Sequence, residues 1–385
     1  MGRERRVELI KGIEKERDGR LLLTYVTSTR PGFSISMADD CIRLIYEHLS
    51  KTKPEQRKKG IDLFLYSHGG SGVLPWRLVN LIREFTSSFE VLVPYKAYSA
   101  ATLTALGADR ILMHPMGELG PIDPSVSNRF NPDDPFSPGN KIPIDVEDVS
   151  SYISLIKDDV GITHQDELIK AIEILAQKIH PLALGNVKRH HSQSELTARK
   201  LLRLHMPAGE ESKIQSIVTN LKSKLFFHGH PINRKEARED LNLKVENPNQ
   251  KLEKLMWGLY QEYENELSLR TGFNPIEIMT NAEKPIEDSI LKLTKELNDL
   301  DQEKEESKKK INELKRQIQK SEMDLQMLQV PIDQLKGAYV ESRELCHVFN
   351  VSGRIKKLPT PQNLPSISPP IVFDVFKQCW ELEER

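Results

Sequence analysis

Two patterns of apolar and polar residues alternate over the first part of the chain. Four short apolar runs have the length of buried strands: residues 21–26, 61–66, 91–93 and 110–113. Between them lie three stretches with apolar or small residues at helical spacing: residues 38–49, 74–85 and 99–106. Strands that alternate with helices in this way predict an α/β fold with a mainly parallel sheet covered by helices.

The pattern changes further along the chain. Apolar residues keep one heptad register from residue 286 to residue 328, which predicts a coiled coil. Pro331 is expected to break this helix before a second short one, and recurrent prolines at 357–370 indicate a linker. We therefore predict four parts: a domain at 1–248, a helical connector at 249–283, a coiled coil at 284–345 with a break at Pro331, and a proline-containing tail at 346–385.

The composition of the chain argues against several classes of protein. The 385 residues carry 55 Lys and Arg against 56 Asp and Glu, a net charge of −1, so no overall field favours nucleic acid. The three cysteines are Cys41, Cys346 and Cys379; their odd number and wide spacing speak against a disulfide framework and favour a reducing compartment. The charged first residues lack the apolar stretch of a signal peptide, and no apolar run approaches the roughly 20 residues of a membrane helix. We expect a soluble, cytoplasmic protein that does not bind membranes.

A glycine-rich turn, SHGGSG at residues 67–72, follows the second predicted strand. Without side chains, Gly69 and Gly70 allow the backbone to approach a substrate carbonyl and turn N–H groups toward it. They are therefore candidates for an oxyanion hole. The alternative is a tight strand-to-helix turn that binds no ligand.

A serine begins the predicted small-residue helix, in the sequence AYSAAT at residues 97–102. The N–H groups and the positive dipole at a helix start favour developing negative charge beside Ser99. The Ala100 N–H is a further candidate donor to an oxyanion. The alternative is that Ser99 only caps the helix.

Three motifs occur in a specific order: LFLYSHGGSG, then VPYKAYSAATLTALGADRILMHP, then GELGPIDPS. Together they resemble the serine dehydrogenase proteinase family, which is related to signal peptide peptidase A and more distantly to Clp peptidase. The resemblance covers about residues 5–245, including FFHGHPINRKEARE. It implies a Clp/crotonase-like fold of repeated ββα units, a nucleophile at Ser99, an oxyanion hole around Gly69 and Gly70, and ring-shaped oligomers.

The general base has two candidates, since enzymes related to this family use either a histidine or a lysine. His114 resembles the Clp histidine and would accept a proton near neutral pH. Lys141 resembles the lysine of membrane-associated relatives and would have to be kept neutral by burial. Each residue also has an ordinary explanation, a strand-end histidine or a solvated loop lysine. Both candidates stay open, with Lys141 slightly favoured.

Other motifs do not suggest a cofactor. No clustered cysteine or carboxylate completes a metal site around His190, His191 or the histidines at 228 and 230. Neither GxxxxGK[ST] nor GxGxxG occurs, so no nucleotide cofactor is predicted.

We therefore predict a serine peptidase that cleaves peptide or protein substrates through an acyl-enzyme on Ser99, without metal or cofactor. One alternative is an inactive scaffold of the same fold that works through its coiled coil, and another is acyl-CoA chemistry. The exposed seam of the coiled coil predicts a homo-oligomer or a coiled-coil partner.

Overall fold

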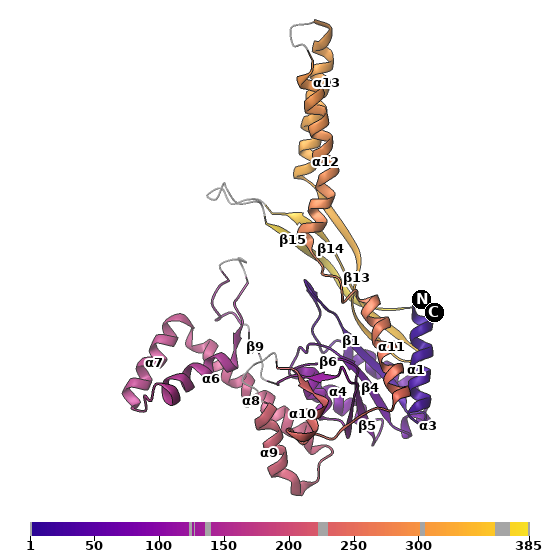
Figure 1. Cartoon of the computed structure of the whole chain (residues 1–385), viewed down its shortest axis with the longest axis vertical. Coiled ribbons are helices and arrows are strands. Elements are labelled where there is room, and N and C mark those ends of the chain that lie inside the picture. Colours follow the sequence, from indigo (N-terminus) through magenta and orange to yellow (C-terminus); the bar gives the residue numbers. More distant parts are fainter. Residues whose placement is uncertain are drawn as a thin grey trace.

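An eight-stranded sheet forms the centre of the molecule (Figure 1). The computed structural model describes residues 2–122, 125–126, 128–134, 140–221, 230–300, 305–358 and 370–383. The strand order is β12-β7-β5-β4-β1-β13-β14-β15, parallel from β12 to β1 and antiparallel from there to β15. The strands are β1 (Leu21–Thr27), β4 (Ile61–Tyr66), β5 (Phe89–Val93), β7 (Arg110–Met113), β12 (Val245–Glu246), β13 (Gln329–Glu341), β14 (Cys346–Lys357) and β15 (Ile371–Leu382).

Helices cover both faces of the parallel part of the sheet. One face packs on α1 (Arg3–Glu16) and α11 (Gln250–Glu266). The other packs on α2 (Cys41–Lys51), α4 (Leu74–Arg83), α5 (Ala100–Leu106) and α8 (Pro181–Arg203). Successive residues of β4 enter opposite cores, so both faces of the strand are buried. That burial explains why the parallel strands appear in the sequence as continuous apolar runs.

Short elements complete the body. The small strands are β2 (Thr29–Arg30), β3 (Phe33–Ser34), β6 (Lys96–Ala97), β8 (Glu118–Leu119), β9 (Ser125–Val126), β10 (Ile144–Asp145) and β11 (Ile232–Asn233). The remaining helical segments of the body are α3 (Pro54–Lys58), α6 (Val146–Ser154), a π-helical turn (Leu155–Asp159), α7 (Gln165–Lys178), a 3-10 turn (Ala208–Glu210), α9 (Glu211–Thr219) and α10 (Arg234–Glu239). β6 and β8 pair in parallel beside the end of β5, which brings the chain around Ser99 close to the edge of the main sheet.

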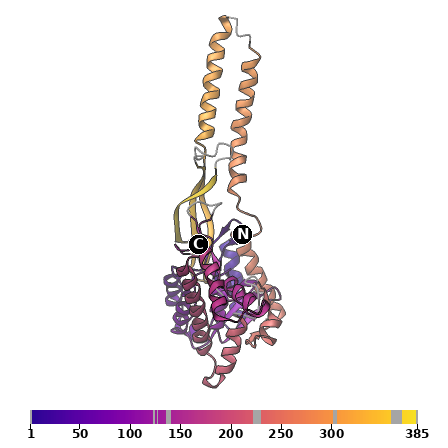
Figure 2. The same cartoon turned by 90° about the vertical axis from the view of Figure 1, so that its left-hand side faces the viewer.

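A helical hairpin projects from the body (Figures 1 and 2). It consists of α12 (Pro275–Asn298) and α13 (Glu305–Gln326), which lie side by side. The helices expected over this part of the chain are present, while the heptad packing of a coiled coil stays a prediction. None of the helices in the described ranges is both long and apolar enough to cross a lipid bilayer.

The structure differs from the sequence prediction after this hairpin. The second helix expected beyond Pro331 is instead strand β13, whose Glu341 pairs with Thr24 of β1. The predicted tail at 346–385 contains β14 and β15, which extend the main sheet. The burial of Tyr339 accounts for this difference. In β13 this residue packs in the same core as α1 and α11, whereas the predicted helix would place it on the seam of a coiled coil.

A buried ion pair joins the two ends of the chain. Arg6 of α1, with no exposed surface, donates from Nε to Glu341 Oε2 over 2.7 Å, and Tyr263 donates to the same oxygen. Arg6 also lies 2.7 Å from a Glu383 carboxylate oxygen. Residues near both termini are therefore part of one packed unit, as Figure 1 shows.

Candidate active site

Ser99 lies in a strained turn between a strand and a helix. It follows β6 and occupies the N-cap position of α5, with φ 52° and ψ −113°. Positive φ is uncommon for a residue with a Cβ, and such strain clusters at functional sites. The Ser99 side chain makes no capping hydrogen bond to α5. The interpretation of Ser99 as a simple helix cap therefore lacks its defining contact.

The glycine turn lies directly against Ser99. An ideal Cβ on Gly69 would be 2.8 Å from Ser99 Cβ and 2.8 Å from the Tyr98 carbonyl oxygen. At Gly70 the same atom would be 2.2 Å from the carbonyl oxygen of Met37. Both glycines also have positive φ, 102° and 155°. Only glycine allows the backbone to approach this closely in this conformation.

Hydrogen bonds hold the glycine turn in place, and two backbone N–H groups beside Ser99 have no acceptor among the described residues. The Met37 N–H donates to Gly69 O over 2.8 Å, and the Gly69 N–H donates to Ser67 Oγ over 3.0 Å. Within the residues that the structure describes, the N–H groups of Gly70 and Ala100 have no acceptor. The Ala100 nitrogen lies 3.1 Å from the ideal Cβ position of Gly69, so the helix start and the turn are in contact.

A hollow of about 610 Å³ opens beside Ser99 and Gly70. His68 and His190 also line it, and Ser99 itself is half-buried. Three apolar side chains line the same hollow: Val73, Leu103 and Ile122. The Ser99 hydroxyl is therefore accessible from a partly enclosed space with both apolar and imidazole groups.

Helix α8 carries His190 into this hollow. His190 and Ser194 are separated by one helical turn and therefore lie on the same face of α8. Ser194 Oγ donates to the carbonyl oxygen of Ile122 over 2.5 Å, and Ala198 and Leu201 of α8 pack in the core with α5. The His190 ring has no hydrogen-bond partner among the described residues. Burial lowers its pKa, with a smaller effect from the Arg189 charge, which favours a neutral imidazole near neutral pH.

His68 precedes the two glycines on the other side of the hollow. Its ring stacks on Tyr98 with centroids 5.5 Å apart, and Tyr98 donates its hydroxyl to Glu118. Burial lowers the pKa of His68, and the nearby Lys96 charge lowers it further. The stacked ring is thus held beside the turn that contacts Ser99.

The two bases predicted from the sequence lie elsewhere. His114 stacks on Trp257 of α11 at 5.1 Å, and its Nδ1 accepts the Met116 N–H over 3.1 Å. Lys141 Nζ lies 2.7 Å from Asp133 Oδ1. Neither residue lines the hollow beside Ser99 as far as the structure describes it. The structure therefore brings together Ser99, Gly69, Gly70 and Ala100, and not these two side chains.

No motif in the sequence singles out His190 as a base. The available signal is its helical register, because Val187, Ser194, Ala198 and Leu201 form the buried stripe of α8 and His190 falls next to that stripe. The pattern identifies a side chain near the core, but it does not reveal which part of the core lies opposite.

Comparison with known families matches the part of the chain that contains this turn. Residues 34–159 match a family model described as ClpP-like SDH-type serine proteinase. This segment of the chain is therefore similar to that family of serine proteinases. The matched segment includes Ser99 and both glycines but ends before α8.

Two archaeal proteins are also similar to parts of this chain. Uncharacterized protein MJ0137 of Methanocaldococcus jannaschii is 32% identical over 80 residues, which cover 21% of this chain and 28% of the relative. Uncharacterized protein MJ1495 of the same organism is 27% identical over 131 residues, 32% of this chain and 42% of the relative. The chain thus spans less than half the length of each of these relatives.

Proposed function

We propose that this protein is a serine peptidase that hydrolyses peptide bonds through an acyl-enzyme on Ser99. The strained turn that holds Ser99 against two glycines carries the proposal, since it exposes a hydroxyl beside unpaired backbone N–H groups. The serine proteinase family of residues 34–159 supports it. A Clp/crotonase arrangement of ββα units belongs to the same proposal, supported by short strands β6 and β8, which follow β5 and β7.

In the proposed reaction Ser99 Oγ attacks the carbonyl carbon of the scissile peptide while a base removes its proton. The Gly70 and Ala100 N–H groups stabilise the resulting oxyanion. The C–N bond then breaks, the base returns the proton to the leaving amine, and water hydrolyses the ester. The Gly69 N–H, which was also predicted as a donor, would first have to release Ser67 Oγ.

We propose His190 as the proton acceptor. It lines the same hollow as Ser99 and has no other partner among the described residues. Lys141 and His114 remain the alternatives from the sequence, and each would have to leave its present contact with Asp133 or Trp257.

Labelling with a fluorophosphonate probe tests both proposals. Wild type should be labelled, and Ser99→Ala should not; equal labelling of the two proteins would refute Ser99 as nucleophile. His190→Ala should slow labelling by about 100-fold or more, the usual contribution of a general base. His191→Ala is the matched control and should behave as wild type. Loss in Lys141→Ala or His114→Ala, with none in His190→Ala, would reassign the base and leave Ser99 in place.

The hollow also suggests which substrates would be cleaved. Val73, Leu103 and Ile122 offer apolar surface, and no Lys, Arg, Asp or Glu is among the described residues that line the hollow. We propose that the residue on the acyl side of the cleaved bond is neutral and apolar. Fluorogenic peptides with Leu at this position should be cleaved faster than matched peptides with Asp or Lys.

The second candidate function is an inactive scaffold of the same fold that works through α12 and α13. The projecting hairpin favours it, because Leu291, Met323 and Met327 expose more than half of their surface there. Such a hairpin could bind a second copy or another helical partner. Covalent labelling of Ser99 by the fluorophosphonate would count strongly against a purely structural role.

A further inference from the structure

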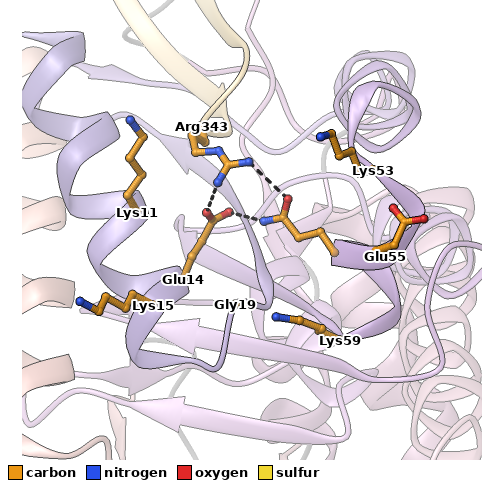
Figure 3. Close-up of a pocket in the computed structure, with 9 residues that line it drawn as sticks. Lys11, Glu14, Lys15, Gly19, Lys53, Glu55, Lys59 and Arg343 are labelled. Atoms are coloured by element: carbon orange, nitrogen blue, oxygen red, sulfur yellow. Dashed lines mark hydrogen bonds and ion pairs between the residues drawn. The ribbon is translucent and has the colours of Figure 1, made fainter.

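A second hollow, of about 420 Å³, lies between α1, α3 and the turn that joins β13 to β14 (Figure 3). We call it the basic hollow. Gly19, which shortly precedes β1, and Lys59, which shortly precedes β4, both line it. The glycine turn at residues 67–72 follows the other end of β4. The basic hollow and Ser99 therefore lie at opposite ends of the same strand.

Five cationic side chains line the basic hollow against two carboxylates. The cations are Lys11 and Lys15 from α1, Lys53 and Lys59 from the two ends of α3, and Arg343 from the β13–β14 turn. Since the whole chain has a net charge of −1, this excess is a local feature. Like charges gathered at one place create a positive potential that attracts anions.

The carboxylate at the base of the hollow does not neutralise the lysines. Glu14, only 5% exposed, accepts the Leu22 N–H over 3.2 Å. It also accepts hydrogen bonds from Gln56 Nε2 over 3.1 Å and Arg343 Nη1 over 3.4 Å, as Figure 3 shows. All four lysines are exposed, and none forms an ion pair with another described residue.

The positive field continues into an adjoining hollow. That hollow shares Lys53 and Arg343 with the basic hollow and adds Lys51. Burial lowers the pKa of nearby His347, while the Glu47 charge raises it and the Lys51 charge lowers it.

We propose that the basic hollow binds a compact anion that carries several phosphate groups. Ammonium groups are strongly hydrated point charges that commonly bind phosphate, and four of them from two helices border one small space. Lys59 Nζ would lie 2.9 Å from an added Cβ on Gly19, so glycine leaves room for this ammonium at the rim. In Figure 3 the ends of Lys53 and Lys59 turn toward the Glu14 and Arg343 side of the hollow.

Isothermal titration calorimetry of the full chain with inorganic tripolyphosphate at low salt tests this site. The variant Lys53→Ala/Lys59→Ala should bind at least about tenfold more weakly than wild type, a loss of roughly 1.4 kcal/mol. The control Lys58→Ala/Lys244→Ala removes two exposed lysines that do not line the hollow. It should weaken binding clearly less than Lys53→Ala/Lys59→Ala, because neither of the two removed side chains lines the hollow.

Several results would overturn the proposal: no heat from wild type, equal weakening in both double variants, or equally tight and equally mutation-sensitive binding of a hexaglutamate peptide. A nucleoside triphosphate serves as a second probe. Tighter binding than tripolyphosphate would assign a nucleotide as the source, and equal binding would assign the phosphate chain alone. Ser99→Ala should bind as wild type, since the site is independent of the proposed peptidase activity.

Discussion

The close approach of Gly69 to Ser99 makes the glycine turn sensitive to a single methyl group. In Gly69→Ala the new Cβ would meet both Ser99 Cβ and the Tyr98 carbonyl at 2.8 Å, with φ at 102°. We expect this variant to lose about 1–3 kcal/mol in free energy of unfolding, the cost of one strained backbone position. The displaced turn should also slow fluorophosphonate labelling of Ser99 at least about tenfold, because misplaced oxyanion donors lose their effect. Chemical denaturation and labelling kinetics measure the two effects.

Gly72 provides the matched control for Gly69. It lines the same hollow, yet no heavy atom lies within 4 Å of an ideal Cβ there. Gly72→Ala should therefore change stability and labelling little. If both alanine variants lost labelling equally, the contact between Gly69 and Ser99 would not explain the loss.

A buried histidine pair makes stability depend on pH. His48 Nδ1 lies 2.7 Å from Ser342 Oγ, and its Nε2 lies 3.1 Å from His347 Nδ1. Burial, with a smaller effect from His347, lowers the pKa of His48 from 6.5 to about 3. Between these values the unfolded chain binds the proton and the folded chain does not, so stability is full above pH 6.5 and falls as pH drops toward 3.

We therefore expect His48 to contribute a loss of about 2–3 kcal/mol between pH 7.5 and pH 4.5. Urea unfolding at both pH values measures it. The variant His48→Gln, which cannot titrate, should lose less on the same change of pH, although carboxylates still contribute to both proteins. An identical pH dependence in the two proteins would contradict the assignment.

At the scale of elements, helix α8 connects the core to the proposed base. Ser194 Oγ donates to Ile122 O next to the hollow, one helical turn from His190. We expect Ser194→Ala to cost about 1 kcal/mol for the lost hydrogen bond and to slow labelling of Ser99 severalfold. Ser192→Ala, at an exposed position of the same helix, should change neither. Lost stability with unchanged labelling would show that this hydrogen bond does not position α8 for catalysis.

The sequence predicts the type of an element correctly where a strand is buried on both faces. The parallel strands are buried on both faces, so residues 21–26 and 61–66 form continuous apolar runs that are visible in the sequence. β13 is different, since its pairing with β14 is irregular between Ile332 and Leu335 and again between Lys336 and Ala338. These shifts break the period of two and leave apolar spacings that also fit a heptad. The apolar pattern of this segment therefore predicts a helix although the segment forms a strand.

Only part of the candidate site can be predicted from the sequence. Ser99 and the glycine turn are local features that follow neighbouring parallel strands, so their meeting at one edge of the sheet follows from the strand order. His190 comes from α8, a helix that begins more than 80 residues after Ser99 in the chain. Only the packing of α8 on α5 determines what this side chain faces, and a single sequence does not encode that packing in a readable pattern.

At the scale of the whole molecule, the projecting hairpin is separable from the sheet that holds the site. α12 enters the body through Met279, which is fully buried, whereas its later part and α13 lie beyond the body in both views. We expect replacement of residues 286–325 by a short Gly-Ser linker to preserve labelling of Ser99. If the hairpin mediates self-association, the molar mass measured by light scattering after size exclusion should fall.

The replacement of residues 286–325 tests self-association only because it ends before β13. Extending it to residue 340 would also remove most of β13, the strand that links β1 to β14 in the sheet. This longer deletion should unfold much of the body and abolish labelling, because buried strand partners would lose their pairing. An unchanged molar mass after the shorter deletion, with labelling intact, would show that oligomers form through the body and would leave the hairpin free for a different partner.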